Sequence, residues 1–519
     1  MRTKIEMGFS ALAEWVYMHR LKSLLMLLVL AAALISGLPK LTIDTSTEGF
    51  LHDNDPTLIA YNAFRDQYGQ DDVVIVAVKP PEVFDRGFLQ RLQQLHNRLE
   101  SELPYLDEVT SLVNARNTRG EGDTLIVEDL LENFPEDDAA LGELKQRVLN
   151  NPLYRDLLIS GDANFTTLVV RASSTPTTLS NDELMGGFDD TESTDDSAPT
   201  YLSDAQSFEL VSAVKKVVAD FKGDDFSVSI AGSPVVTHAL KQTIMADMRK
   251  FMGLALGAIA VFLFIMFRRA SGVILPLVVV VVSLLSTLGL MGHLGVALKV
   301  PTQILPSFLL AVSVGASVHV LAIFFYRLYH ADDKQTAIVY SYGHSGLPIM
   351  MTSLTTAAGL ASFSTAEIAP IADLGQFAAA GVMLSLLYTM ILLPITIALL
   401  PIRTDLKQKE QSRTVFLDNI LKRIAYLSTH YPRRIVAGSA LLMVLALYSA
   451  TQINFSHNPL TWLPQSLDVR QSTEIIDANL KGSVTMEVII DSGRENGLQQ
   501  PQMLNRLEQM GQELAQWKQ

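Results

Sequence analysis

Residues Pro301–Arg327 read PTQILPSFLLAVSVGASVHVLAIFFYR. This run is long enough to cross a bilayer, which requires about 20 apolar residues. Its middle is interrupted by small and polar residues: Ser313, Gly315, Ala316, Ser317 and His319. Small residues allow helices to approach closely, and a histidine at membrane depth is costly unless it faces protein or water. The run therefore predicts a membrane helix with a functional midpoint, and the remaining chain is interpreted around it.

The composition agrees with a membrane protein. Of 519 residues, 49% are hydrophobic, and the net charge of −14 comes mainly from one long polar segment. Because no basic face stands out, nucleic acid is not an expected partner. The chain has no cysteine, which excludes disulfides, thiolate metal sites and thiol nucleophiles. We find no catalytic constellation, no phosphate-binding loop and no clustered metal ligands, so neither an enzyme nor a cofactor is predicted.

Seven apolar segments are predicted to span a membrane: residues 21–39, 249–267, 272–293, 302–325, 347–366, 374–400 and 433–452. The first segment is too long for a signal peptide and lacks a clear cleavage site, so it is interpreted as an uncleaved anchor. Arg and Lys gather before the first segment and in every second connection after it, as in Arg268-Arg269. The positive-inside rule then predicts a cytoplasmic N-terminus, with the segments after the first and seventh spans on the other side of the membrane.

Residues 41–246 form a predicted periplasmic domain of mixed α and β structure. Its expected strands are 73–78, 109–113, 166–172 and 226–230, and amphipathic helices are expected around 88–99 and 208–218. This order, β-α-β, insertion, β-α-β, is the split βαβ or ferredoxin-like arrangement. The acidic insertion at 124–150 is expected to be helical, and residues 173–205 are expected to form a mobile loop.

An internal repeat begins after the first and seventh segments. Ile43 is followed 30 residues later by the strand from Val73, and Ile453 is followed 31 residues later by Val484. Equal orientation of both copies predicts a parallel repeat, as found in transporters. The second copy reaches only Gln519, which suggests that the chain is a fragment or that a second chain completes it.

We therefore expect a polytopic α-helical membrane protein with a porter-type α+β domain. The predicted divisions are an N-terminal anchor (1–40), the periplasmic domain (41–246), a five-helix membrane block (247–402), a cytoplasmic linker (403–432), a seventh span (433–452) and the start of a second periplasmic domain (453–519).

Four stretches together resemble the RND superfamily of exporters, and most closely its MMPL branch, which is related to sterol-sensing-domain proteins. They are Phe50–Pro56 (FLHDNDP), Pro348–Gly359 (PIMMTSLTTAAG), Ile368–Gly375 (IAPIADLG) and Pro459–Pro464 (PLTWLP). The resemblance covers the whole chain, as a first half and the start of a second half. It implies a proton-driven secondary transporter in a bacterial inner (cytoplasmic) membrane, with its large domain in the periplasm, that exports hydrophobic or lipid-like substrates.

In this family the fourth helix carries acidic residues that serve proton coupling. The matching positions here are Ala316 and Ser317, so the acid is missing. Ser313, Ser317 and His319 are the remaining relay candidates. Ser313 and Ser317 share a helix face, whereas Ser317 and His319 do not. A neutral His319, hydrogen-bonded to a neighbouring helix, is the alternative to a proton carrier.

Other polar and small positions have plainer interpretations. Gly253, Gly257 and Gly315 are expected to serve helix packing. Glu367 and Asp373 are expected to flank helix ends at the outer surface, with substrate access as the alternative.

Two further functions stay open from the sequence. One is a sterol-sensing-like lipid-binding regulator without turnover, and the other is a secretion-assisting membrane factor. The predicted partners are membrane lipids and a lipid-like substrate; a homo-oligomer and periplasmic or outer-membrane partners are also open.

Overall fold

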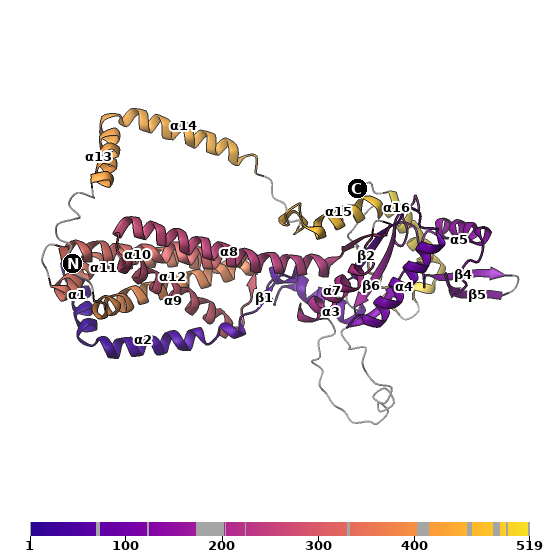
Figure 1. Cartoon of the computed structure of the whole chain (residues 1–519), viewed down its shortest axis with the longest axis horizontal. Coiled ribbons are helices and arrows are strands. Elements are labelled where there is room, and N and C mark those ends of the chain that lie inside the picture. Colours follow the sequence, from indigo (N-terminus) through magenta and orange to yellow (C-terminus); the bar gives the residue numbers. More distant parts are fainter. Residues whose placement is uncertain are drawn as a thin grey trace, which may run out of the picture.

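The computed structural model describes residues 2–68, 73–121, 124–172, 202, 204–223, 225–329, 333–401, 415–453, 459–480, 488–494 and 497–516. The predicted mobile loop at 173–205 and the predicted strand at 484–490 lie mostly outside these residues. The described part of the chain is mostly helical, with a helix bundle at one end and a small sheet at the other (Figure 1).

The seven predicted spans correspond to seven helices that are long and apolar enough to cross a membrane, by length and composition. They are α2 (Arg20–Ile35), α8 (Ser233–Phe267), α9 (Ala270–His293), α10 (Leu305–Tyr329), α11 (Lys334–Ala361), α12 (Ala369–Leu399) and α14 (Pro432–Ala450). Inside the chain, 61% of the most apolar stretch of α12 is buried, compared with 6% of α8 and none of α14. α12 is therefore the core of the bundle, α8 lies at its margin, and α14 stands apart from it (Figure 1).

Glycines bring α2 and α9 into backbone contact. A Cβ at Gly289 would overlap the Leu34 carbonyl oxygen, and one at Gly292 would overlap the Gly37 carbonyl oxygen. Such close approach is typical of packing between membrane helices. The anchor helix is thereby fixed to the bundle over its last turn and the residues that follow.

One helix in the N-terminal segment was not predicted. Helix α1 (Arg2–Met18) precedes the anchor and packs on α11, where Phe9 fits against Gly346 and Ser10 against Gly343. Another unpredicted helix, α13 (Val415–His430), lies in the predicted cytoplasmic linker.

The main sheet has four strands in the order β3-β6-β2-β7, and all its pairs are antiparallel. They are β2 (Val73–Lys79), β3 (Leu106–Thr110), β6 (Thr166–Ala172) and β7 (Ser227–Ala231). Helices α4 (Arg86–Glu102) and α7 (Asp204–Ala219) pack on one face, where Val74, Val76 and Val78 of β2 enter their common core. The predicted order of these strands and helices is confirmed.

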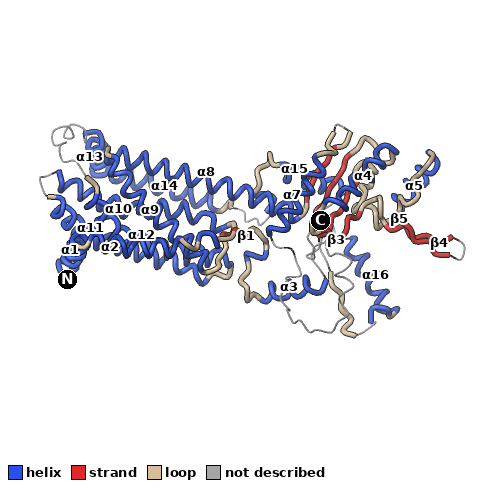
Figure 2. Tube along the Cα trace, turned by 60° about the horizontal axis from the view of Figure 1, so that its bottom comes forward, coloured by secondary structure: helices blue, strands red, loops and turns tan. Residues whose placement is uncertain are grey.

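Two expectations within this domain are wrong. The insertion at 124–150 is not wholly helical, because β4 (Arg116–Glu121) and β5 (Thr124–Asp129) form a hairpin before α5 (Asp138–Asn150). The β-branched pair Ile126-Val127 favours a strand there. The strand expected at 109–113 ends at Thr110, because Asn114 accepts a hydrogen bond from the Ser111 amide and turns the chain. The hairpin projects from the end of the domain far from the bundle (Figure 2).

The second copy of the repeat contributes a helix to the first sheet. α15 (Asp468–Leu480), from the second copy, places Ile476 and Leu480 against Ile75, Ala77 and Ala231, on the face of the first sheet opposite α4. α3 (Pro56–Tyr68), from the first copy, lines a hollow with residues 489–492, Arg494 and residues 497–499 of the second copy. The described parts of the two copies are therefore in contact.

One helix joins the sheet to the bundle. α8 runs without a break from just after β7 to Phe267, so it begins 16 residues before the predicted span (Figure 2). At the same end of the bundle, β1 (Ile43–Asp44), which follows α2, pairs in parallel with β8 (Leu298–Lys299), which follows α9, and this separate two-stranded sheet ties the ends of those two helices together.

Replacing Gly289 by Ala tests the backbone contact between α2 and α9. Because the new methyl group would meet backbone that cannot move independently, G289A is expected to destabilise the protein by about 1–3 kcal/mol. The measurement is thermal unfolding in detergent. The matched control is G257A on α8, where a Cβ would meet nothing within 4 Å. Equal destabilisation by both variants would contradict the assigned contact.

Candidate functional site

The structure separates the predicted relay residues of α10. Ser313 and Ser317 are buried on the inward face, and Ala316 packs against the same bundle core. His319 lies on an exposed face of the helix. The two serines therefore belong to one cluster, and His319 does not join them.

Ser317 meets a hydroxyl from the core helix. Its Oγ lies 3.3 Å from Thr389 Oγ1 on α12, and Tyr342 of α11 donates a hydrogen bond of 2.7 Å to the Thr389 carbonyl oxygen. One residue earlier, the hydroxyl of Tyr388 lies 2.8 Å from Ser286 Oγ on α9. These contacts tie α9, α10 and α11 to α12 through buried neutral groups.

α10 and α12 meet in a regular register. Gly381 packs against Leu309, and Ser317 meets Thr389, so both contacts join residues 72 positions apart. The same offset places Ser313 opposite Ser385, one turn from the Ser317–Thr389 contact. Both side chains are buried, and neither hydroxyl has a hydrogen-bond partner among the described residues. Leaving such a hydroxyl unpaired costs about 1–3 kcal/mol, so the packing of α10 against α12 is less stable at this level.

We call this cluster the hydroxyl seam; its members are Ser286, Ser313, Ser317, Tyr342, Ser385, Tyr388 and Thr389. Five of them, from α9, α11 and α12, were absent from the predicted site: Ser286, Tyr342, Ser385, Tyr388 and Thr389. The sequence signal was the four-residue spacing of Ser385 and Thr389, which matches that of Ser313 and Ser317. Since the seam contains no carboxylate, it can exchange hydrogen bonds but holds no charge near neutral pH.

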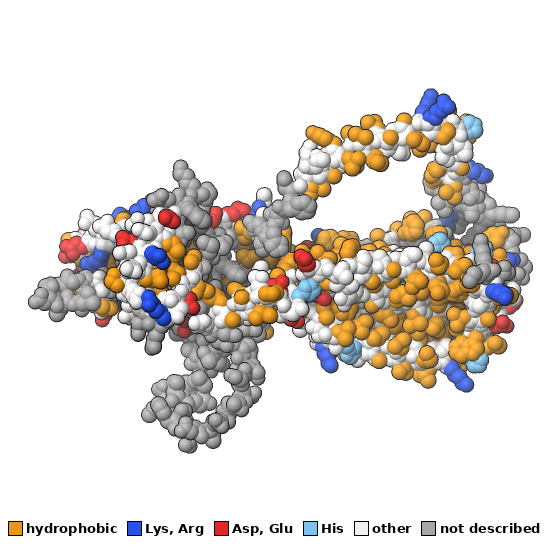
Figure 3. All heavy atoms as spheres, turned by 180° about the vertical axis from the view of Figure 1, so that it is seen from behind, with side chains coloured by type: hydrophobic (Ala, Val, Ile, Leu, Met, Phe, Trp, Pro, Cys, Tyr) orange, Lys and Arg blue, Asp and Glu red, His pale blue; other side chains and the backbone are white. Residues whose placement is uncertain are grey.

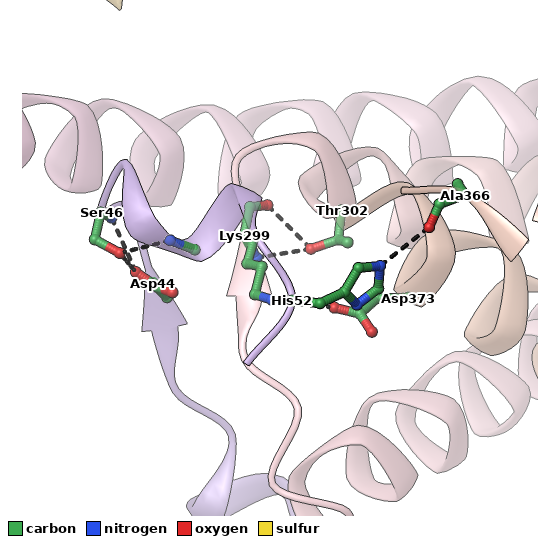
Figure 4. Close-up of polar contacts among 8 residues, drawn as sticks. Asp44, Ser46, His52, Lys299, Thr302, Ala366 and Asp373 are labelled. Carbon is green, nitrogen blue, oxygen red and sulfur yellow. Dashed lines mark hydrogen bonds and ion pairs between the residues drawn. The ribbon is translucent and has the colours of Figure 1, made fainter. Parts of the chain in front are cut away.

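A second polar group lies where the sheet domain meets the bundle (Figure 4). Lys299 Nζ is 3.3 Å from Asp373 Oδ2, and both side chains are less than one-fifth exposed. Thr302 Oγ1 accepts a hydrogen bond from the Lys299 amide and donates one to its carbonyl oxygen, which fixes the backbone beside the ion pair. His52 Nε2 lies 3.0 Å from the Ala366 carbonyl oxygen. The segment after α2 is thus in contact with the connection between α11 and α12, at the end of the bundle nearest the sheet.

The sequence offered a signal for this ion pair. Lys299 is the base in one predicted outer connection, and Asp373 is an acid in the other. Opposite charges in neighbouring connections that hold few other charges are candidates for pairing, although Asp373 was predicted only to flank a helix end or to serve substrate access.

A cavity of about 960 Å³, here called the junction cavity, opens at this level. Its wall comes from residues 44–65, the starts of α8 and α12, part of α7 and residues 295–299. Charged groups of both signs line it, together with apolar and aromatic side chains: Asp44, Glu48, Asp53, Tyr61, Arg65, Phe208, Lys241, Lys299 and Asp373. Such a mixed wall suits a molecule that has a polar and an apolar part.

His238 connects the cavity wall to the second repeat. Its ring stacks on Phe208 with centroids 4.3 Å apart, and its Nδ1 is 3.4 Å from Lys215 Nζ. Burial lowers the pKa of Lys215, and the Asp468 carboxylate at the start of α15 acts in the opposite direction. Helix α15 of the second copy therefore contributes, through Asp468, to the charge environment of Lys215 next to the cavity wall.

The predicted packing glycines Gly253, Gly257 and Gly315 face open space, since a Cβ at any of them would meet nothing within 4 Å. No described helix packs on them, and their role in packing stays a prediction.

The two serines of α10 should respond differently to removal of the hydroxyl. S317A breaks the contact with Thr389 and is expected to destabilise the protein by about 1 kcal/mol. S313A removes a buried hydroxyl that has no partner among the described residues, so it should be neutral or stabilising. Thermal unfolding of both variants in one detergent checks the difference. A larger loss for S313A than for S317A would show that the seam is wrongly assigned.

Comparisons with known proteins agree with the geometry. Residues 199–435, which include α8 to α12, match the model of the MMPL family. A protein of Methanocaldococcus jannaschii that is named as a membrane protein is 22% identical over 390 residues, which make up 72% of this chain and 90% of that relative. The resemblance to the MMPL family is confirmed over residues 199–435.

Proposed function

We propose that this MMPL-family membrane protein is an RND-type secondary transporter that exports hydrophobic or lipid-like molecules across or from the inner membrane. The four-stranded sheet, with its β-α-β, insertion, β-α-β order, would be a ferredoxin-like porter domain on the periplasmic side. The proposal depends most on one observation, the polar junction cavity between that domain and the outer end of the bundle.

The charge distribution supports this orientation. Figure 3 shows apolar side chains covering the bundle and charged side chains at its two ends. Arg20 and Lys22 begin α2, and Arg268 and Arg269 join α8 to α9, all at the bundle end away from the sheet. By the positive-inside rule this end would be cytoplasmic.

The cavity wall suggests how an amphiphile would bind. A charged or zwitterionic headgroup would contact the Lys299–Asp373 pair and neighbouring charges, while its apolar chain would follow Phe208 and the apolar flank of the bundle. Because Lys299 and Asp373 belong to the ends of the bundle, movement of the porter domain over them would change the shape of the cavity.

Proton drive is part of the proposal. A proton that crosses 100 mV gains about 2.3 kcal/mol, enough to bias a domain movement. The hydroxyl seam supplies no acid, so the coupling group would be His319, on the exposed face of α10, or a residue on a helix that packs against that face. A lipid-binding regulator without turnover is the second candidate, and the uncharged seam is the observation that favours it.

Reconstitution in vesicles distinguishes the two functions. With a fluorescent phospholipid, the transporter should move lipid faster when a pH gradient is imposed. Lipid binding without gradient-dependent movement would support the regulator instead.

Variants of the ion pair link that activity to the junction cavity. K299Q and D373N each leave a half-buried charge without its partner, which should lower transport several-fold. The double variant K299D/D373K restores opposite charges and should recover part of the rate. E367Q, on an exposed neighbour, is the matched control. Full transport by both single variants, or equal loss in E367Q, would remove the ion pair from the mechanism.

A further inference from the structure

Helix α1 has three different faces. The first is fully buried at Ala13 and Val16, next to Phe9, which packs on Gly346 of α11. Ser10 on this helix also donates a hydrogen bond of 3.5 Å to the Val339 carbonyl oxygen. α1 is therefore part of the bundle, and its remaining surface is held at a fixed angle to α11.

The second face is apolar and exposed. Ile5, Leu12, Trp15 and Met18 follow one another at helical spacing, and Trp15 and Met18 are 52% and 62% exposed. The third face carries Glu14, which is exposed and, at about 100° per residue, points almost opposite to Leu12 but adjoins Met18 at the edge of the apolar face. A helix with one protein face, one apolar face and one acidic face is suited to a boundary between protein, lipid and water.

The surroundings of α1 indicate which boundary this is. α1 lies at the end of the bundle farthest from the sheet (Figure 1), and only His19 separates it from the spanning helix α2. The first turns of α2 also expose apolar side chains, Leu21 and Leu25. The apolar face of α1 is therefore followed directly along the chain by the apolar surface of the bundle.

Aromatic and basic groups mark the same level. The rings of Trp15 and His19 have centroids 5.1 Å apart, and the Arg20 guanidinium lies 6.0 Å from the centre of the Tyr17 ring. Trp and Tyr concentrate at the membrane–water boundary, and Arg and Lys near it attract anionic headgroups.

We propose that α1 lies in the headgroup region of the bilayer, with Ile5, Leu12, Trp15 and Met18 in the outer part of the acyl chains and with Arg20 and Lys22 facing lipid phosphates. The partner of this surface is the lipid itself, not a soluble protein. Only the choice of the cytoplasmic leaflet depends on the proposed function. Because α1 packs on Gly343 and Gly346, lipid contact at α1 fixes the adjacent end of α11.

The chain has no cysteine, so single nitroxide labels can be placed without other changes. L12C and E14C are labelled in the full chain and reconstituted in vesicles of phosphatidylcholine and phosphatidylglycerol. The label at position 12 should be relaxed mainly by oxygen, which concentrates in lipid. The label at position 14, the matched control, should be relaxed mainly by a water-soluble nickel complex.

Two results would overturn the proposal. Equal access of the nickel complex to both labels would place the apolar row in water, and protection of position 12 from both reagents would mean that protein covers it. A second measurement does not need a label: in a W462F/W517F background, brominated lipids should quench most of the Trp15 fluorescence. No quenching would overturn the proposal independently, whether or not the transport assay succeeds.

Discussion

The fold depends on the continuity of α8. A helix that crosses lipid must satisfy its backbone hydrogen bonds internally, which favours an unbroken helix. α8 begins directly after the edge strand β7 and continues to Phe267, so one rigid element belongs to both the sheet and the bundle. Because the start of α8 lines the junction cavity together with residues 295–299, a movement of the sheet carried by this helix would change the shape of the cavity.

The hydroxyl seam and the junction differ in what they can do. The seam joins four helices through neutral groups, with unpartnered hydroxyls at the level of Ser313 and Ser385. The junction contains the half-buried Lys299–Asp373 pair and a cavity with charges of both signs. The charged junction is suited to binding a charged headgroup. The uncharged seam is instead suited to a contact between helices that slide past one another.

The sequence was sufficient for the parts of the fold set by local pattern. The seven apolar runs and the β-α-β halves follow from periodicity and length, and both are found in the structure. α1 was missed because its apolar residues are shared between a buried and an exposed face, which weakens any single stripe. The β4–β5 hairpin was missed because the acidic residues around Ile126 and Val127 suggested a solvated helix.

The candidate site was only partly predictable. Ser313 and Ser317 were identified from their position in a span, but their partners come from α9, α11 and α12. Pairing between distant segments, such as Lys299 with Asp373, depends on how helices pack and leaves only an indirect trace in one sequence. The packing of α15 on the sheet of the first copy likewise has no signal in either copy alone.

A disulfide across the β1–β8 pair tests most directly the proposal that the junction moves during transport. Ile43 and Leu298 are partners in that pair, and the native chain has no cysteine to compete. I43C/L298C should transport lipid when reduced and lose gradient-dependent transport when oxidised, while lipid binding persists. Undiminished transport by the fully oxidised protein would contradict the account, because the junction would then not need to move.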